Sequence, residues 1–85
     1  MSDGAFMAAV EQVLQVYPDL SKLQAAVVAA DEMDIAHDGR SFARIFGVAH
    51  ALVLRQVNAL DEAGALLRIT KREPRTMRTH YVVSL

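Results

Sequence analysis

Arg55 and Asn58 lie three residues apart in a segment whose apolar residues recur at helical spacing, which places both side chains on one face of the expected helix. Arginine can donate paired hydrogen bonds to the edge of a guanine, and asparagine can pair with the edge of an adenine. Ala51 shares this face, and His50 lies near the helix start. A solvated helix face would explain any one of these residues alone, but their grouping makes them the best candidates for reading base edges.

A basic cluster near the C-terminal end is the second group of residues whose side chains could bind a ligand. Four basic side chains surround Pro74, with Glu73 as the opposing acid: Lys71, Arg72, Arg75 and Arg78. Such a cluster can place positive charge against phosphate groups beside a groove. A charged surface turn is the alternative explanation, and the excess of positive charge favours the phosphate contact.

The densest group of titratable residues gives little indication of catalysis. It comprises Asp31, Glu32, Asp34, His37 and Asp38. These residues lack the order of a calcium-binding loop, and the histidines of the chain do not have the His-x-x-x-His spacing of a zinc site. The chain has no cysteine, which excludes disulfides, zinc–thiolate sites and thiol nucleophiles. We therefore expect no enzyme activity, no metal and no cofactor.

The composition predicts one globular domain. A chain of 85 residues is too short to form two hydrophobic cores. Its hydrophobic content of 53% is too high for a disordered chain. The net charge of −1 hides an uneven distribution, because residues 1–38 carry one basic against seven acidic residues and residues 39–85 carry eight basic against three acidic. This asymmetry is typical of a protein with one face that meets a polyanion.

The sequence also favours a cytoplasmic location and no membrane contact. Its apolar stretches fall far below the roughly 20 residues that a membrane span requires. Asp3 stands where a signal peptide would carry positive charge, and no adequate apolar run follows it.

Apolar spacing predicts two helices in the first half of the chain. The first covers roughly residues 4–17 and ends before Pro18. The second begins after Ser21, whose hydroxyl can form a capping box with Gln24, and runs to about residue 34.

A short unit and a longer helix follow. Residues 35–40 are predicted to form a loop or a very short edge strand. Ser41 is then expected to cap a short helix that ends at Gly47, and the next helix covers about 50–63, with Gly64 as its C-terminal cap.

The last third of the chain changes to the period of a β-strand. Leu67 and Ile69 alternate with polar residues, and a second run with apolar residues follows Pro74. This pattern predicts a β-hairpin with the basic cluster at its tip.

The two helices around Gly47 have the pattern of a helix-turn-helix. Ala43 allows the helices to approach, Gly47 makes the turn, and Val48 and Val53 fix the angle between them. From about residue 20 to the end, the chain resembles the winged helix-turn-helix domains of bacterial transcription regulators, in particular the MarR-like group. The resemblance is carried by residues 42–48, Val53, Val57, Leu60, residues 61–64 and the ending Val83-Ser84-Leu85.

The resemblance implies a recognition helix at 50–63 and a wing at 71–78. It places Arg78 where the family's wing arginine reaches toward the minor groove or the backbone. Thr76 stands where the family commonly has an aspartate that orients this arginine, and Ala49 stands where a serine or threonine commonly caps the recognition helix. Both departures predict a lower affinity for DNA.

The fold expected from these patterns is mainly α with a small β-hairpin, a winged helix-turn-helix in the order α-α-α-α-β-β with an extra N-terminal helix. A single domain would cover residues 1–85. It would comprise an N-terminal helix (1–18), a three-helix core (19–64) with the helix-turn-helix at 41–63, and a wing hairpin (65–85).

The expected function is a DNA-binding transcription regulator with a recognition helix in the major groove of double-stranded DNA and a basic wing on the backbone. The alternative is a winged helix module that contacts protein and binds no nucleic acid. The residues expected to contact DNA are Ser41, Arg44, His50, Ala51, Arg55, Asn58, Lys71, Arg72, Arg75 and Arg78.

The chain ends without the C-terminal helices through which MarR-like proteins dimerise, so a homodimer would use another element. The first helix is the candidate, because a three-helix winged domain does not require it. The alternative is that this helix packs on its own domain. Its apolar face consists of Phe6, Val10, Val13, Leu14 and Tyr17.

Overall fold

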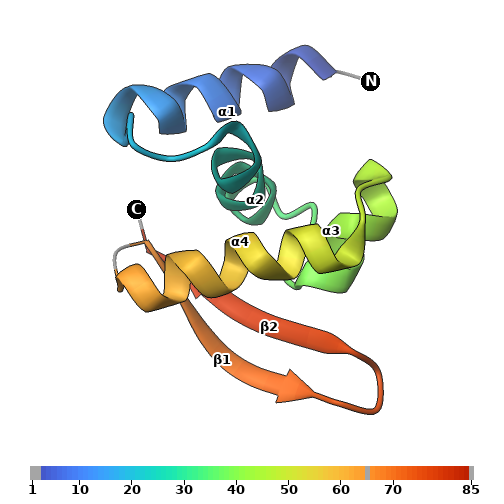
Figure 1. Cartoon of the computed structure of the whole chain (residues 1–85). Coiled ribbons are helices and arrows are strands. Elements are labelled where there is room, and N and C mark those ends of the chain that lie inside the picture. The colour runs from blue at the N-terminus through green and yellow to red at the C-terminus, as the bar shows by residue number, and fades with distance from the viewer. Residues whose placement is uncertain (1–2, 65, 85) are drawn as a thin grey trace.

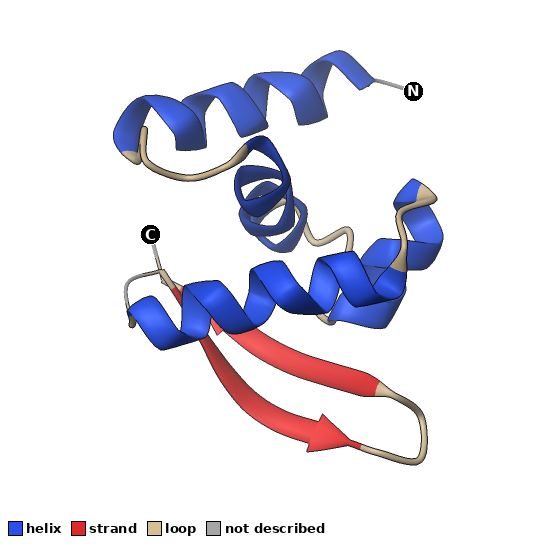
Figure 2. Cartoon of the chain, in the orientation of Figure 1, coloured by secondary structure: helices blue, strands red, loops and turns tan. Residues whose placement is uncertain are grey.

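Four helices precede a two-stranded antiparallel hairpin in the computed structural model, which describes residues 3–64 and 66–84 (Figures 1 and 2). The mainly helical fold with a hairpin is confirmed. The elements are α1 (Asp3–Val16), α2 (Lys22–Glu32), α3 (Gly39–Phe46), α4 (His50–Ala63), β1 (Leu67–Glu73) and β2 (Arg78–Val83).

Helix α1 lies across α2 on the side away from the hairpin (Figure 1). Val10 and Val13 are buried in this contact, with exposed fractions of 3% and 7%. The ring of Phe6 stacks on Phe46 of α3 with a centroid distance of 4.9 Å. Leu14 and Tyr17 also pack against the core. These contacts favour the alternative in which the apolar face of α1 completes the core of its own chain.

Helix α2 forms the centre of the molecule, because α1 covers one side while α4 and β2 contact the other. Its predicted capping box is confirmed. The Gln24 backbone N–H donates to the Ser21 hydroxyl at 3.1 Å, and the Ser21 backbone N–H donates to the Gln24 side-chain oxygen at 2.9 Å. The small side chains of α2 let its neighbours approach closely, and its buried residues are Ala25, Val27, Val28, Ala29 and Ala30.

The prediction that Ser41 caps α3 is wrong, because Asp38 occupies that position and the helix begins at Gly39. The two carboxylate oxygens of Asp38 accept from the backbone N–H and the hydroxyl of Ser41, each at 2.8 Å. An aspartate three residues before the serine can satisfy both donors, which a serine cap could not do. Gly39 then lies close to α4, where a Cβ atom would be 3.4 Å from Leu54 Cδ2.

The predicted ends of α3 and α4 are confirmed, since Gly47 and Gly64 both adopt left-handed backbone conformations with φ of 68° and 66°. The Gly47 N–H donates to the Ala43 carbonyl, which closes α3. This turn sets the direction in which α4 leaves α3.

Replacing Gly47 tests the contribution of this turn. We expect Gly47→Ala to lower the free energy of unfolding by about 1 kcal/mol, because an L side chain disfavours the left-handed conformation. The matched control is Gly4→Ala in α1, where a Cβ atom would meet nothing within 4 Å and the helix propensity would improve. Urea denaturation measures both changes, and an equal effect of the two variants would contradict the requirement for a left-handed turn.

The hairpin contains an irregularity that changes which side chains face the helices. Leu67 pairs with Val83 and Ile69 with Tyr81, but the next pair joins Lys71 to His80, so that Thr70 is an extra residue in β1. Such a bulge shifts the alternation of every later side chain by one position.

Of the predicted loop at residues 35–40, residues 35–38 are confirmed as a loop with one bridge between Asp38 and His80, whereas Gly39 and Arg40 belong to α3. The predicted inward face of α4 is also confirmed, because Val53, Val57 and Leu60 are buried. Among residues 3–64 and 66–84, no helix is both long and apolar enough to cross a membrane.

Candidate nucleic-acid interface

The outer face of α4 is open to solvent along most of its length. Ala51, Arg55 and Glu62 are exposed and Asn58 is partly exposed. The helix begins at His50, and the N-cap residue Ala49 provides no side-chain cap, as the sequence indicated. An exposed helical face of this kind can enter a groove of DNA if no other part of the chain covers it.

A side-chain hydrogen bond joins this face to the hairpin. Arg72 Nη2 donates to Asn58 Oδ1 at 3.0 Å, across an interval of 14 residues in the sequence. Arg72 pairs with the buried Thr79, so its side chain leaves the hairpin on the side that meets the helices. If Thr70 were regularly paired and β1 contained no bulge, strict alternation from Leu67 and Ile69 would direct Arg72 to the opposite side.

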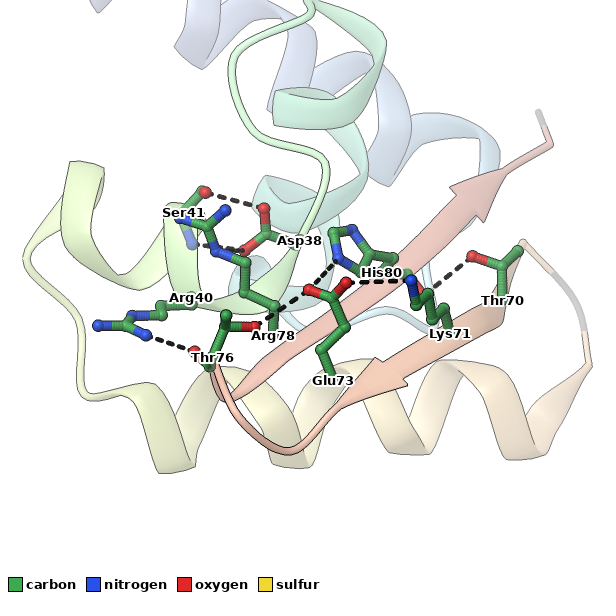
Figure 3. A network of polar contacts seen from close by, with 9 residues as sticks. All are labelled: Asp38, Arg40, Ser41, Thr70, Lys71, Glu73, Thr76, Arg78 and His80. Atoms are coloured by element: carbon green, nitrogen blue, oxygen red, sulfur yellow. Dashed lines mark hydrogen bonds and ion pairs between the residues drawn. The ribbon is translucent and has the colours of Figure 1, made fainter.

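Lys71 and Arg78 of the hairpin belong to a polar network (Figure 3). Glu73 lies at its centre, where its carboxylate is 3.1 Å from Lys71 Nζ and 3.2 Å from His80 Nε2 and accepts from the Thr76 hydroxyl at 3.0 Å. Hydrogen bonds from His80, Lys71 and Thr76 lower the pKa of Glu73 to about 2. Glu73 therefore stays charged and compensates part of the positive charge of Lys71.

Arg78 lies near the start of α3, where its Nε atom is 4.0 Å from Asp38 Oδ1 (Figure 3). This Nε atom is buried and has no hydrogen-bond partner among the described residues. Arg40, at the beginning of α3, donates to the backbone carbonyl of Thr76 in the hairpin turn. Both arginines thus connect the hairpin to α3. The sequence does not identify Arg40 as a site residue, because nothing local to residue 40 indicates where the hairpin turn will lie.

The predicted DNA-contacting residues therefore fall into three groups. Ser41 donates its hydroxyl to Asp38, and His50 has a buried Nε2 near Gly39 without a partner among the described residues. Arg78 lies beside Asp38 at the start of α3, and Lys71 lies beside Glu73 in the hairpin network. The side chains of Ser41, His50, Lys71 and Arg78 thus form the first group, which lies away from the open face of α4. Those on or beside the open face of α4 are Ala51, Arg55, Asn58 and Arg72, and the side chains of Arg44 and Arg75 are exposed elsewhere on α3 and the hairpin turn.

Asp38 is tied to both α3 and the hairpin. Although its burial alone would raise the pKa of Asp38, hydrogen bonds from the backbone and hydroxyl of Ser41 and the charges of Arg78 and His80 lower it below the usual value of 3.8. A carboxylate with a lowered pKa in the folded state contributes stability that is present above its unfolded pKa and is lost as the pH falls.

Two substitutions at Asp38 separate its capping role from its charge. Asp38→Ala removes the cap and is expected to lower the free energy of unfolding by about 1–2 kcal/mol at neutral pH. Asp38→Asn keeps a capping acceptor but removes the ionised group, so its stability is expected to fall less than that of the wild type when the pH drops from about 6 to below about 4. Urea unfolding at both pH values measures this, and parallel acid losses would contradict a role for the Asp38 charge.

Two carboxylates of the acidic cluster at the end of α2 bind His37 in the loop that follows. His37 Nδ1 lies 2.6 Å from Asp31 Oδ1, and His37 Nε2 lies 2.5 Å from Asp34 Oδ1. Hydrogen bonds with Asp31 and Asp34 raise the pKa of His37. The imidazole nitrogens are therefore occupied by the carboxylates, and the described residues contain no group of three or more side chains arranged to hold a metal ion.

Comparison of the chain with protein-family models, curated proteins and solved structures found no match. The resemblance to MarR-like domains therefore remains a prediction from the sequence pattern. The geometry of α4 and the hairpin is therefore the basis for inferring a function.

Proposed function

We propose that this protein is a DNA-binding regulator of transcription that places α4 in the major groove of double-stranded DNA and its basic hairpin against the backbone. The turn at Gly47 and the order of four helices and a hairpin suit a winged helix-turn-helix domain. In this arrangement Arg55 and Asn58 read base edges, while Arg75 contacts phosphate.

One observation carries the proposal above all others, the hydrogen bond between Arg72 and Asn58. It brings a cation of the hairpin beside the open face of α4, although the two segments are separate in the sequence. A ligand that fits against Arg55 and Asn58 would meet this added positive charge. The DNA duplex presents such a combination, with base acceptors in the groove and anionic phosphates at its margins.

The roles of Arg55 and Arg75 are tested by separate alanine substitutions. We expect Arg55→Ala to lose about 1–3 kcal/mol of discrimination at one base pair of a duplex selected from a random pool, because a base-edge contact is removed. We expect Arg75→Ala to weaken binding to all duplexes alike. Fluorescence anisotropy with matched and mismatched duplexes measures both effects, and identical loss profiles for the two variants would contradict this division.

The second candidate is a winged helix module that contacts protein. The observation favouring it is an open, largely apolar groove between α1 and α2, with a volume of about 510 Å³ and a lining that includes Val13, Val16 and Met33. Val16 and Met33 are exposed, and exposed apolar groups can mark contact surfaces. A folded protein that fails to bind duplex DNA at low salt would favour this function over the first.

A further inference from the structure

The open face of α4, together with Arg72 of β1 beside it, presents more hydrogen-bond donors than acceptors. Arg55 and Arg72 carry guanidinium groups, which donate and never accept. Asn58 has an amide that can both donate and accept, but its Oδ1 already accepts from Arg72 at 3.0 Å. Both of its Nδ2 hydrogens remain for a ligand, whereas Oδ1 keeps one lone pair, which lies beside the bound guanidinium.

The positive charge of Arg72 adds to this inequality. A base amino group that approached Asn58 Oδ1 would also approach the guanidinium already bound there, so that donors would face donors. A base acceptor that approached the Asn58 amide nitrogen would instead be attracted by the same charge. The set formed by Arg55, Asn58 and Arg72, which we name the donor face, therefore matches ligands that present acceptors.

The edges of base pairs differ in this respect. In the major groove guanine presents two acceptors, N7 and O6, whereas adenine presents one acceptor and the N6 amino donor. An asparagine with a free oxygen pairs with both groups of adenine, but one lone pair of Asn58 Oδ1 is engaged by Arg72 and the positive guanidinium lies beside the other. The usual preference of asparagine for adenine would therefore be reversed at this position.

We propose that Arg72 acts as a specificity-determining residue, which holds Asn58 as a donor and makes the donor face selective for guanine over adenine. This inference rests on the proposed binding of double-stranded DNA. Arg72 acts here through Asn58, in addition to any contact of its own with the nucleic acid. Glu62, one turn beyond Asn58 on α4, marks the end of the donor face, because its carboxylate can only accept.

The experiment first locates the base pair that Asn58 contacts. Duplexes are selected from a random pool by the wild-type protein, and the position at which Asn58→Ala loses its preference is identified by measuring affinities for each base pair there. We expect the wild type to bind the duplex with guanine at this position about tenfold more tightly than the duplex with adenine.

Arg72→Met then removes the donor while keeping an extended apolar side chain. We expect the guanine-to-adenine affinity ratio to fall about tenfold, because Asn58 Oδ1 becomes free to accept from adenine. The matched control is Arg68→Met, which removes an exposed arginine from the same strand outside the donor face. The control is expected to leave the ratio unchanged, even if both substitutions weaken binding through the lost positive charge.

A second measurement examines the free protein. Arg72→Met is expected to shift the NMR signals of the Asn58 side-chain amide, and Arg68→Met is expected to leave them in place. An unchanged Asn58 amide, an adenine preference of the wild type, or an unaltered base ratio in Arg72→Met would overturn the inference while leaving DNA binding intact. Absence of duplex binding by the folded wild type would overturn the proposed function and this inference together.

Discussion

Raising the salt concentration from about 50 mM to about 200 mM is expected to weaken duplex binding by about 100-fold. This value corresponds to about four phosphate contacts, since each contact releases condensed counterions and steepens the dependence on salt. Arg75 and Arg44 are exposed and can supply such contacts, as can Arg40 at the start of α3 and Arg72 in β1. Fluorescence anisotropy with a labelled duplex at a series of salt concentrations measures the slope.

The contribution of a single cation to this slope is also accessible. Arg75→Gln is expected to reduce the logarithmic slope by about one unit, because one phosphate contact is lost. Arg68→Gln serves as the control, since it removes the same charge from a residue outside the proposed interface. A flat salt dependence of the wild type, or equal changes in both variants, would count decisively against backbone contact by the hairpin.

The second large effect is expected from Val10→Asp, which should unfold the protein or reduce its free energy of unfolding by at least about 3 kcal/mol. Val10 is 3% exposed and belongs to the core cluster. An aspartate at this position would place a carboxylate among apolar side chains without a partner for its charge. Circular dichroism with urea denaturation measures the loss.

Val16→Asp is the matched control on the same helix, because Val16 is 68% exposed. It is expected to change the stability by less than about 0.5 kcal/mol. Sedimentation of both variants separates the two roles considered for α1. A folded Val10→Asp variant with half the mass of the wild-type protein would contradict the intramolecular role and establish a dimer contact through α1.

Much of the fold follows from local patterns that need no tertiary information. The capping box at Ser21 and Gln24 and the glycine ends at residues 47 and 64 depend on interactions within a few residues. The inward positions of α4 follow from the 3.6-residue period of a helix. These features could be predicted because their causes lie within one element.

The features that the sequence did not predict correctly depend on contacts between different helices and strands. The choice of Asp38 over Ser41 as the cap of α3 depends on a carboxylate that also lies beside Arg78 and His80 of β2. The grouping of Arg72 with Asn58 depends on the extra residue in β1, and a count of alternating positions assumes that no such residue is present. Half of the candidate interface could be predicted from α4 alone, whereas the contribution of the hairpin required its register.

The extra residue Thr70 has a consequence for how this surface could diverge in evolution. Inserting one residue into β2 between His80 and Tyr81 would give Thr70 a partner, restore strict alternation along β1, and turn Lys71 and Glu73 toward α4 in place of Arg72. Deleting Thr70 would instead remove the bulge and leave Arg72 facing the helix. One codon gained in β2 would thus exchange a lone cation of β1 for an oppositely charged pair beside the helix, with every existing amino acid unchanged. A change in strand length could alter the ligand preference of such a domain as sharply as a substitution within α4.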